Sequence, residues 1–212
     1  MNKIVLFLII ATGVFFSLGT VSSKDTVTAE PIAASEEKTA IFAGGCFWCV
    51  EADFEKLDGV SKAVSGYSGG AAETANYKQV SYTETGHYEV VRVHYDPAKV
   101  TFSELVEFFW RTIDPTDPDG QFCDKGSSYK TAIFYASDEE ETIVRNSLAS
   151  LNNSKPFDAD IVTYIGPAKP FYYAEEYHQD YYLRNPIRYR FYRNGCGRDK
   201  RLEQLWGSKK KG

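Results

Sequence analysis

Two cysteines three residues apart lie in the segment Gly44-Gly45-Cys46-Phe47-Trp48-Cys49. The apolar residues 39–43 predict a short strand that runs into the two glycines, and the apolar stripe that begins at Phe47 predicts a helix that starts at Cys46. The sulfur of Cys46 would then lie beside unpaired backbone N–H groups at the positive end of a helix dipole, which lowers the pKa of a thiol. Cys46 is therefore a candidate nucleophile. The alternative is a small buried hydrophobic side chain.

Cys49 gives this pair the C-x-x-C spacing that is typical of redox-active helices. A zinc site is a poor alternative because no second close pair of cysteines exists, since Cys123 and Cys196 are isolated in the sequence. The three histidines of the chain do not complete a zinc-binding motif either. We therefore expect thiol chemistry and no metal.

Glu89 is the second side chain whose position indicates chemistry. Alternation along residues 87–96 places Glu89 on the same strand face as Val91 and Val93, and puts Arg92 on the opposite face. A carboxyl group buried against apolar neighbours has a raised pKa and keeps its proton near neutrality, as a general acid requires. The alternative is a glutamate at the end of a sheet that pairs with a surface base.

The other elements must position these groups. Two capping-box pairs predict helices, and alternating apolar residues predict three further strands. The pairs are Thr101 with Glu104 and Ser137 with Glu140, and the strands are 88–95, 129–136 and 160–165. This order predicts an α+β fold, a mixed α/β sandwich in which helices cover one side of a small sheet. From Pro167 onward tyrosine and proline are frequent and periodicity is absent, which predicts a long coil.

The composition fits one globular domain, because 43% of the 212 residues are hydrophobic and 25% are charged. The net charge of −5 disfavours broad nucleic-acid binding.

The N-terminal residues have the order of a signal peptide: Lys3, an apolar run over 4–18 and then small residues. We expect a signal peptide at 1–23, a linker at 24–37 and a folded domain at 38–212.

The predicted signal also suggests where the protein acts. Its apolar run is shorter than the roughly 20 residues that a membrane-spanning helix prefers. Cleavage after about Ser23 would export the mature chain to a bacterial periplasm or another extracytoplasmic space. An uncleaved segment would leave the protein anchored in the membrane.

Gly45-Cys46-Phe47-Trp48 resembles the signature of the A-type peptide methionine sulfoxide reductases, and the chain follows the pattern of that family from Lys38 to about His178. Six further motifs occur in the family's order. They are Gly66-Tyr67-Ser68-Gly69-Gly70, Asn76-Tyr77-Lys78-Gln79-Val80, Thr85-Gly86-His87-Tyr88-Glu89, Asp114-Pro115-Thr116, Asp124-Lys125-Gly126-Ser127-Ser128-Tyr129 and Tyr173-Ala174-Glu175-Glu176-Tyr177-His178-Gln179.

This resemblance implies a ferredoxin-like core with an extended C-terminal coil, and a 38–212 domain that reduces the S epimer of methionine sulfoxide, free or in proteins. No cofactor is expected. The resemblance also implies a role for each matching residue. Cys46 is the nucleophile, Glu89 the acid, Tyr77 and Tyr129 the hydrogen-bond donors to the sulfoxide oxygen, Phe47 and Trp48 the pocket for the substrate methyl group, and Asp124 a polar pocket residue.

Reduction by this route leaves a sulfenic acid on Cys46, which a second thiol must condense with. We expect this thiol to be Cys196, because Gly195 and Gly197 would let its segment swing toward the helix start. Cys49 would need local distortion of its helix to form a disulfide with Cys46. Cys123 is either a bystander or a residue on the substrate side.

The expected partners are methionine sulfoxide and a thioredoxin-like reductant, and we expect a monomer that binds no nucleic acid. One rival function is a thioredoxin-like dithiol oxidoreductase that uses Cys46 and Cys49, in which Cys49 is essential and Cys196 dispensable. A second rival is a secreted binding module without enzyme activity, whose four cysteines form two structural disulfides.

Overall fold

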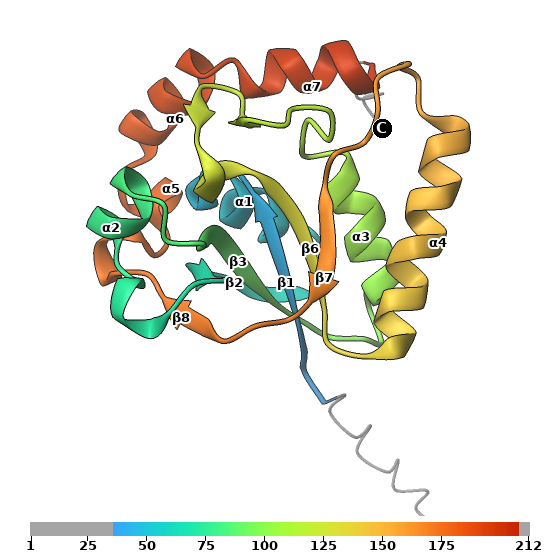
Figure 1. The fold of residues 1–212 in the computed structure, drawn as a ribbon, viewed down its shortest axis with the longest axis horizontal. Coiled ribbons are helices and arrows are strands. Elements are labelled where there is room, and N and C mark those ends of the chain that lie inside the picture. The colour runs from blue at the N-terminus through green and yellow to red at the C-terminus, as the bar shows by residue number, and fades with distance from the viewer. Residues whose placement is uncertain (1–35, 208–212) are drawn as a thin grey trace, which may run out of the picture. The chain divides into compact units, whose positions relative to one another are not determined.

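The computed structural model describes residues 36–207, and a curled six-stranded sheet lies at their centre (Figure 1). Its strands are β1 (Lys38–Gly44), β2 (Val60–Ser68), β3 (Tyr88–Tyr95), β6 (Thr131–Tyr135), β7 (Tyr164–Pro167) and β8 (Phe171–Tyr173). The strand order is β7-β6-β1-β3-β2-β8, and all neighbours are antiparallel except β6 and β7. Two short strands, β4 (Gly120–Gln121) and β5 (Asp124–Lys125), form a separate hairpin.

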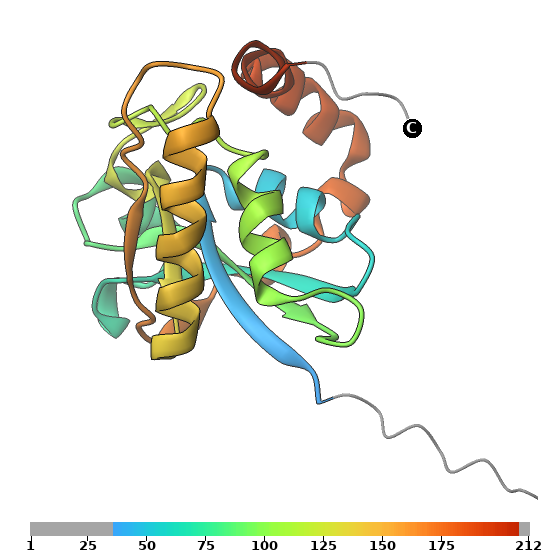
Figure 2. The same ribbon diagram turned by 90° about the vertical axis from the view of Figure 1, so that its right-hand side faces the viewer.

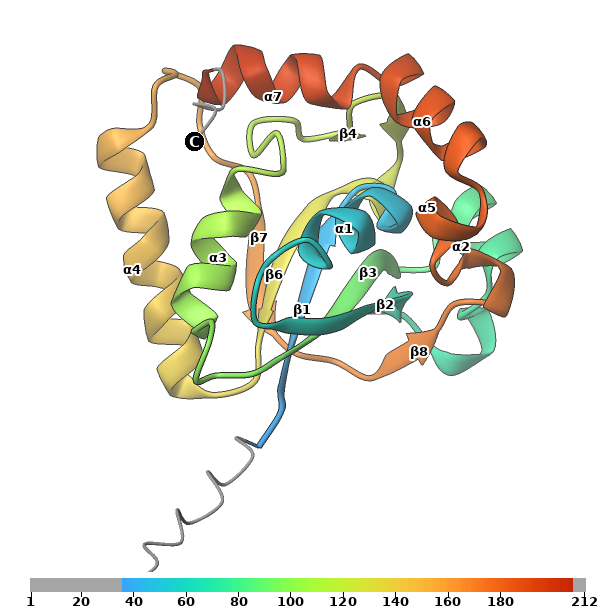
Figure 3. The same cartoon turned by 180° about the vertical axis from the view of Figure 1, so that it is seen from behind.

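Three helices cover one face of this sheet, as the view from behind makes clear (Figure 3). They are α1 (Phe47–Phe54), α3 (Phe102–Trp110) and α4 (Asp138–Ser154). Phe42 of β1 packs against Phe54 of α1 and Phe109 of α3, with ring centroids 4.9 and 5.0 Å apart. α3 and α4 lie side by side (Figure 2), and the indole N–H of Trp110 donates to the Ser147 hydroxyl over 2.8 Å. The mixed α/β prediction, with helices on one side of a sheet, is confirmed.

The predicted helix starts are also confirmed. The Thr101 hydroxyl accepts from the backbone N–H of Glu104, and the Glu104 carboxylate accepts from the backbone N–H of Thr101, so α3 begins with a full capping box. Ser137 caps α4 in the same way, but the Glu140 carboxylate reaches the N–H of Ala136 instead. These local pairs fix helix starts without tertiary contacts, which is why sequence finds them.

Strand ends are predicted less well. The strand predicted at 88–95 coincides with β3, whereas the strand predicted at 160–165 is displaced to β7. Pairing between strands sets the position of β7, because its residues are those that lie parallel to β6. The predicted signal peptide at 1–23 lies outside the described residues, as does nearly all of the linker at 24–37. Within residues 36–207, no helix is long and apolar enough to cross a membrane.

The predicted C-terminal coil is wrong, because helices occupy most of this segment. They are α5 (Tyr181–Arg184), α6 (Pro186–Gly195) and α7 (Arg198–Trp206). Pro186 stands at the first position of α6, where its fixed backbone angle favours a helix start. Few apolar side chains of these helices are buried, namely Tyr189 on α6 and Leu202 and Leu205 on α7. So few apolar residues among so many charged ones give no clear period in the sequence.

A final helix and three short 3₁₀ turns complete the fold. They are α2 (Tyr77–Tyr82) and the turns Ala72–Thr74, Ser127–Tyr129 and Glu176–His178. Figure 1 shows α2, α5 and α6 gathered beside the start of β3, next to the start of α1. Segments from distant parts of the sequence therefore surround the junction between β1 and α1.

Candidate active site

A cavity of about 230 Å³ opens at the β1–α1 junction. Its lining includes every predicted site residue except Cys196, together with one tyrosine that the sequence did not single out. The lining residues are Cys46, Phe47, Trp48, Tyr77, Glu89, Asp124, Tyr129 and Tyr192. Three come from the β1–α1 junction and the others from five separate segments, so the fold, rather than proximity in sequence, creates the site.

Cys46 stands at the turn from strand to helix. It is the N-cap residue of α1, with backbone angles outside the helical region, and its carbonyl accepts from the N–H of Cys49 over 3.0 Å. Gly45 before it has a φ of +81°, and a Cβ there would lie 2.5 Å from Cβ of the buried Gln121. A side chain at Gly45 would therefore displace the turn that holds the nucleophile.

The thiol pKa values differ from the prediction. Burial raises the pKa of Cys46 well above its ordinary value, and the Cys49 thiol and the carboxyl groups of Glu89 and Asp124 raise it further. The pKa of Cys49 falls to about 7, because the Cys46 thiol hydrogen-bonds to its sulfur and Arg198 and Arg193 lie near. The helix dipole alone does not predict that the pKa of Cys49 lies below that of Cys46, because these values also depend on the side chains around each sulfur.

Glu89 lies where the alternation of β3 placed it, on the face that Val91 and Val93 share, and it is 2% exposed. Burial raises its pKa to about 8, although the backbone N–H of Phe47 donates to its Oε2 over 3.0 Å and opposes the shift. The carboxyl group therefore keeps a proton at pH 7. This supports its predicted role as a general acid in direct reach of the start of α1.

Two tyrosine hydroxyls face the same cavity. Burial raises the pKa of Tyr77 to about 12, and burial likewise raises the pKa of Tyr129, while the charge of Glu89 acts in the same direction on both. The Tyr129 hydroxyl in turn acts to lower the pKa of Glu89, against the effect of burial. Both hydroxyls consequently stay protonated and are available as hydrogen-bond donors to a bound oxygen.

Side chains outside the cavity hold the aromatic residues of its wall in place. Tyr181 of α5 stacks on the Trp48 ring at 3.7 Å, and the Trp48 indole N–H donates to Nδ1 of His178 over 3.1 Å. Burial lowers the pKa of His178 to about 4, so the ring is neutral and can accept this hydrogen bond. The imidazole also packs against Phe47 and Tyr77, with centroids 5.0 and 4.4 Å away.

The segment 173–179 therefore supports the site from outside the cavity. The Glu175 carboxylate accepts from the backbone N–H of Tyr77 over 2.9 Å and from the Tyr67 hydroxyl over 2.8 Å. The Gln179 side chain accepts from the N–H of Ser65 and donates to its carbonyl, which ties the segment to β2. These contacts explain why this motif accompanies the pocket residues.

Tyr192 is the pocket residue that sequence reasoning missed. It lies on α6, and its hydroxyl donates to the Asp124 carboxylate. Burial raises the pKa of both groups, although the Tyr192 hydrogen bond opposes the shift at Asp124. The sequence offered no signal for it, because it stands among 15 tyrosines in a segment predicted to be coil.

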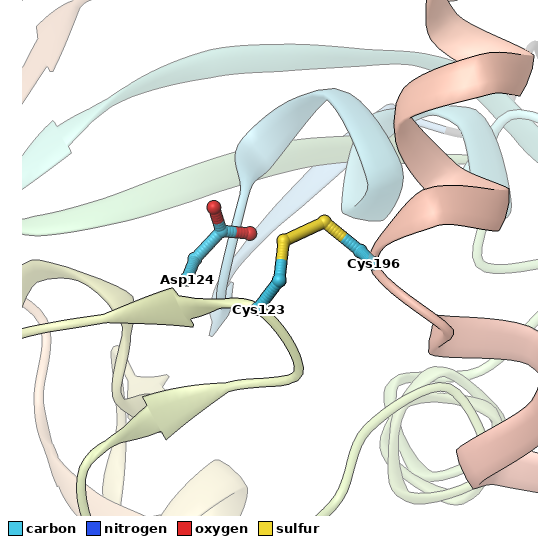
Figure 4. A group of neighbouring side chains, drawn as sticks. All are labelled: Cys123, Asp124 and Cys196. Atoms are coloured by element: carbon cyan, nitrogen blue, oxygen red, sulfur yellow. A yellow bond between two sulfur atoms is a disulfide. The ribbon is translucent and has the colours of Figure 1, made fainter.

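Cys196 lies outside the cavity and is joined to Cys123 by a disulfide, with Cα atoms 4.8 Å apart. Figure 4 shows this bond linking the turn between β4 and β5 to the end of α6, with Asp124 next to Cys123. Cys46 and Cys49 are both free thiols. Among the described residues, one group brings three potential metal ligands within 4.8 Å of one another, namely Cys123, Asp124 and Cys196, and two of its members are the bonded sulfurs.

A buried nucleophilic thiol, a protonated carboxyl group and hydroxyl donors around one small cavity define a thiol-dependent oxidoreductase. The comparison with known families agrees. Residues 38–210 match the family described as peptide methionine sulfoxide reductase. The chain belongs to this family.

Individual relatives cover most of the chain. It is 47% identical over 180 residues to peptide methionine sulfoxide reductase MsrA 2 of Caulobacter vibrioides, which covers 85% of this chain and 91% of that protein. It is 44% identical to MsrA of Bacillus subtilis, over 83% of this chain and 99% of that protein. The crystal structure of reduced Mxr1 from Saccharomyces cerevisiae matches with a TM-score of 0.67 and 33% identity, covering 77% of this chain and 92% of that one.

Proposed function

We propose that the protein reduces the S epimer of methionine sulfoxide, free or in proteins, to methionine and thereby repairs oxidative damage. The observation that carries this function is the cavity itself, where Cys46, Glu89 and the hydroxyls of Tyr77 and Tyr129 face one volume of about 230 Å³. That volume fits a sulfoxide group and its methyl substituent. Phe47 and Trp48 supply the apolar side against which the methyl group packs.

The chemical step joins the thiol to the acid. A sulfoxide oxygen is a poor leaving group until it is protonated, so protonated Glu89 gives its proton to that oxygen while the Cys46 sulfur attacks the sulfoxide sulfur. The Tyr77 and Tyr129 hydroxyls stabilise the developing charge on oxygen. The proton of the Cys46 thiol then returns to Glu89. The hydroxyl group passes from the substrate sulfur to the Cys46 sulfur as the bond between the two sulfurs breaks. The products are methionine and a Cys46 sulfenic acid, so the atoms balance without another reactant.

The second step closes a disulfide. Cys49 is a free thiol next to Cys46, with the lowered pKa described above. Since Cys46 is the N-cap of α1 and not part of its helical turns, the distortion expected for a Cys46–Cys49 bond is smaller than the sequence suggested. Attack of the Cys49 thiolate on the sulfenic acid forms the disulfide and releases water once the hydroxide takes up a proton.

The bond between Cys46 and Cys196 stays a prediction. In the structure Cys196 is bonded to Cys123, so this route first requires reduction of that disulfide. The structure therefore favours Cys49 as the first partner of Cys46, and peptide mapping of the oxidised enzyme decides between the two. In either case a thioredoxin-like dithiol returns the enzyme to its reduced form.

Two further proposals concern the fold and the location. The order β6-β1-β3-β2, with α1 after the first of these strands along the chain and α3 before the last, supports a ferredoxin-like core. The order of residues in 1–23 supports export to the periplasm or another extracytoplasmic space. Mass spectrometry of the native protein tests export, and recovery of an intact 1–23 segment from the cytoplasm would contradict it.

A turnover assay with separated epimers of a methionine sulfoxide peptide and dithiothreitol tests the function. We expect turnover of the S epimer alone. Cys46→Ser is the control and should abolish it, since a hydroxyl cannot supply the thiolate. Equal turnover of both epimers, or substantial turnover by the Cys46→Ser variant, would contradict the proposed function.

A further inference from the structure

A guanidinium group lies buried beneath the active-site junction. Arg198, the first residue of α7, is 2% exposed. Its Nη1 donates to the carbonyl of Gly44 over 3.1 Å, and its Nη2 donates to the carbonyl of Thr112 over 2.8 Å. Gly44 is the last residue of β1, two positions before Cys46. Arg198 thus connects the C-terminal helices directly to the turn that carries the nucleophile.

The charge of Arg198 is incompletely neutralised. Its Nε has no hydrogen-bond partner, and the carboxylate that faces it, Asp53 Oδ2, lies 3.8 Å away. A buried cation is costly unless anions or hydrogen-bond acceptors surround it. The site therefore favours a second negative charge nearby.

Arg193 of α6 adds a second cation. Its Nη1 lies 2.9 Å from Asp53 Oδ1, and its Nη2 lies 2.7 Å from Asp199, whose side chain is 58% exposed. Asp53 is consequently the one buried carboxylate that these contacts place between two guanidinium groups. Two guanidinium groups thus face one buried carboxylate beside α1, and the second carboxylate, Asp199, is largely exposed and screened by solvent.

Cys49 is the side chain that can supply a negative charge next to these two arginines, as a thiolate. It is 2% exposed and packs with Ala52 and Tyr189 in a small cluster between α1 and α6. The titratable or charged groups that act on it or respond to its charge are Cys46, Glu89, Asp53, Tyr189, Arg193 and Arg198. Arg198 and Arg193 are the two cations in this set, and both lower the pKa of Cys49.

The Cys123–Cys196 disulfide lies next to Arg198 on both of the segments that it joins. Cys196 precedes Arg198 by two residues, and Cys123 follows Phe122, whose ring lies 4.7 Å from the Arg198 guanidinium. The segment 122–123 therefore meets the segment 196–198 through a covalent bond and a cation–π contact. Gly197, between Cys196 and Arg198, has a φ of +68°, which turns the chain sharply from the disulfide to the buried arginine.

We propose that Arg198 and Arg193 are positioning residues for the resolving step: their guanidinium groups stabilise the thiolate of Cys49, and the Cys123–Cys196 disulfide holds Arg198 in place. The assignment rests on the proposed function, because it concerns the disulfide that forms after sulfoxide reduction. In this arrangement the second cysteine pair supports the first and need not exchange with it during turnover.

The first test measures Cys49 without any substrate. In a Cys46→Ser background, the rate of Cys49 alkylation by iodoacetamide is followed against pH. Replacing Arg198 with Met should raise the apparent pKa of Cys49 and slow its alkylation at pH 7 roughly fivefold, because the thiolate loses its cation. Arg198→Lys keeps the charge and should lie between. Arg190→Met, at an exposed position of α6, is the matched control and should change nothing.

An unchanged alkylation profile in Arg198→Met would overturn the proposal. If that variant does not fold, Arg193→Met gives the same decision through the second guanidinium group, since it too should shift the profile upward. Because no sulfoxide is used, an altered Cys49 profile stands even if the epimer assay fails. The two proposals can therefore fail separately.

The second test addresses the disulfide. The double variant Cys123→Ser/Cys196→Ser should form the Cys46 sulfenic acid at the wild-type rate in a single turnover, yet condense it with Cys49 more slowly. Its Cys49 alkylation profile, again with Cys46→Ser, should shift in the same direction as that of Arg198→Met. Wild-type condensation together with a wild-type profile would show that the disulfide does not hold Arg198.

Discussion

At the scale of single residues, the site combines two groups that both hold a proton in the resting enzyme. Burial keeps the proton on Cys46 and on Glu89, although one must act as a nucleophile and the other as an acid. The arrangement is consistent with attack that is coupled to proton transfer, because a free thiolate next to an ionised Glu89 would place two anions in a small cavity.

Glu89→Gln tests the acid. The amide oxygen can still accept from the N–H of Phe47, so the start of α1 should keep its shape, but an amide cannot deliver the proton. We expect the single-turnover rate of methionine formation at pH 7 to fall by about 10²- to 10⁴-fold. In the wild type the same rate should fall as pH rises through about 8, where Glu89 ionises. An unchanged rate in Glu89→Gln would make Glu89 a structural residue.

Cys46 and Glu89 were predictable from a helix start and a strand face, whereas the other predicted pocket residues came from the resemblance of their motifs to a known family. Glu89 followed from simple alternation, and its burial is confirmed. The acidity of the two thiols was not predictable. Burial sets that of Cys46, and that of Cys49 depends on the Cys46 thiol and on Arg198 and Arg193, which lie about 150 residues away in the sequence. A pKa reports the whole surroundings of a group and not its local helix alone.

At the scale of secondary structure elements, the position of Cys46 at the N-cap of α1 decides which thiols can meet. Its backbone lies outside the helical region, while Cys49 is in the first turn. The same element-level view explains why the C-terminal segment was mistaken for a coil. α6 and α7 bury few apolar residues, and their attachment depends on Arg198 and on the ion pair of Arg201 with Asp114 at 2.7 Å.

Serine variants of the two candidate resolving cysteines test this geometry. We expect Cys49→Ser to release about one methionine per enzyme and then stop, because the sulfenic acid on Cys46 forms but finds no partner. Cys196→Ser should continue to turn over with a thioredoxin-like reductant, more slowly than the wild type. Methionine counting and peptide mapping check both. A mapped Cys46–Cys196 bond, with turnover surviving Cys49→Ser, would instead confirm the pairing expected from sequence.

At the scale of the whole molecule, the C-terminal helices close the fold onto the edge where the active site lies. α6 contributes Tyr192 to the cavity and α7 contributes Arg198 to the junction beneath it. Figure 3 shows α6 and α7 running above β4 and the start of α1. Sequence predicts the sheet and its helical layer, because these depend on regular apolar patterns. It does not predict this closure, which depends on single polar contacts and one disulfide.

Buried carboxyl groups should also make the stability of the whole molecule depend on pH. Burial raises the pKa of Glu51 on α1 to about 8, although the backbone N–H of Asp180 donates to its Oε1 over 3.2 Å. The folded protein therefore holds a proton on Glu51 between pH 4.5 and about 8, where the unfolded chain has released it. The resulting stabilisation is complete below pH 4.5 and is lost as pH rises through about 8.

Glu51→Gln removes this proton exchange. Its amide oxygen can still accept from the N–H of Asp180, so the fold should persist. In urea titrations between about pH 5 and 7.5, the free energy of unfolding of the variant should fall less steeply with pH, by up to about 1.4 kcal/mol per pH unit. Glu104→Gln is the control, because its carboxylate is exposed with a lowered pKa and should leave the slope above pH 5 unchanged. Equal slopes for the wild type and Glu51→Gln would show that Glu51 is ionised in the folded protein.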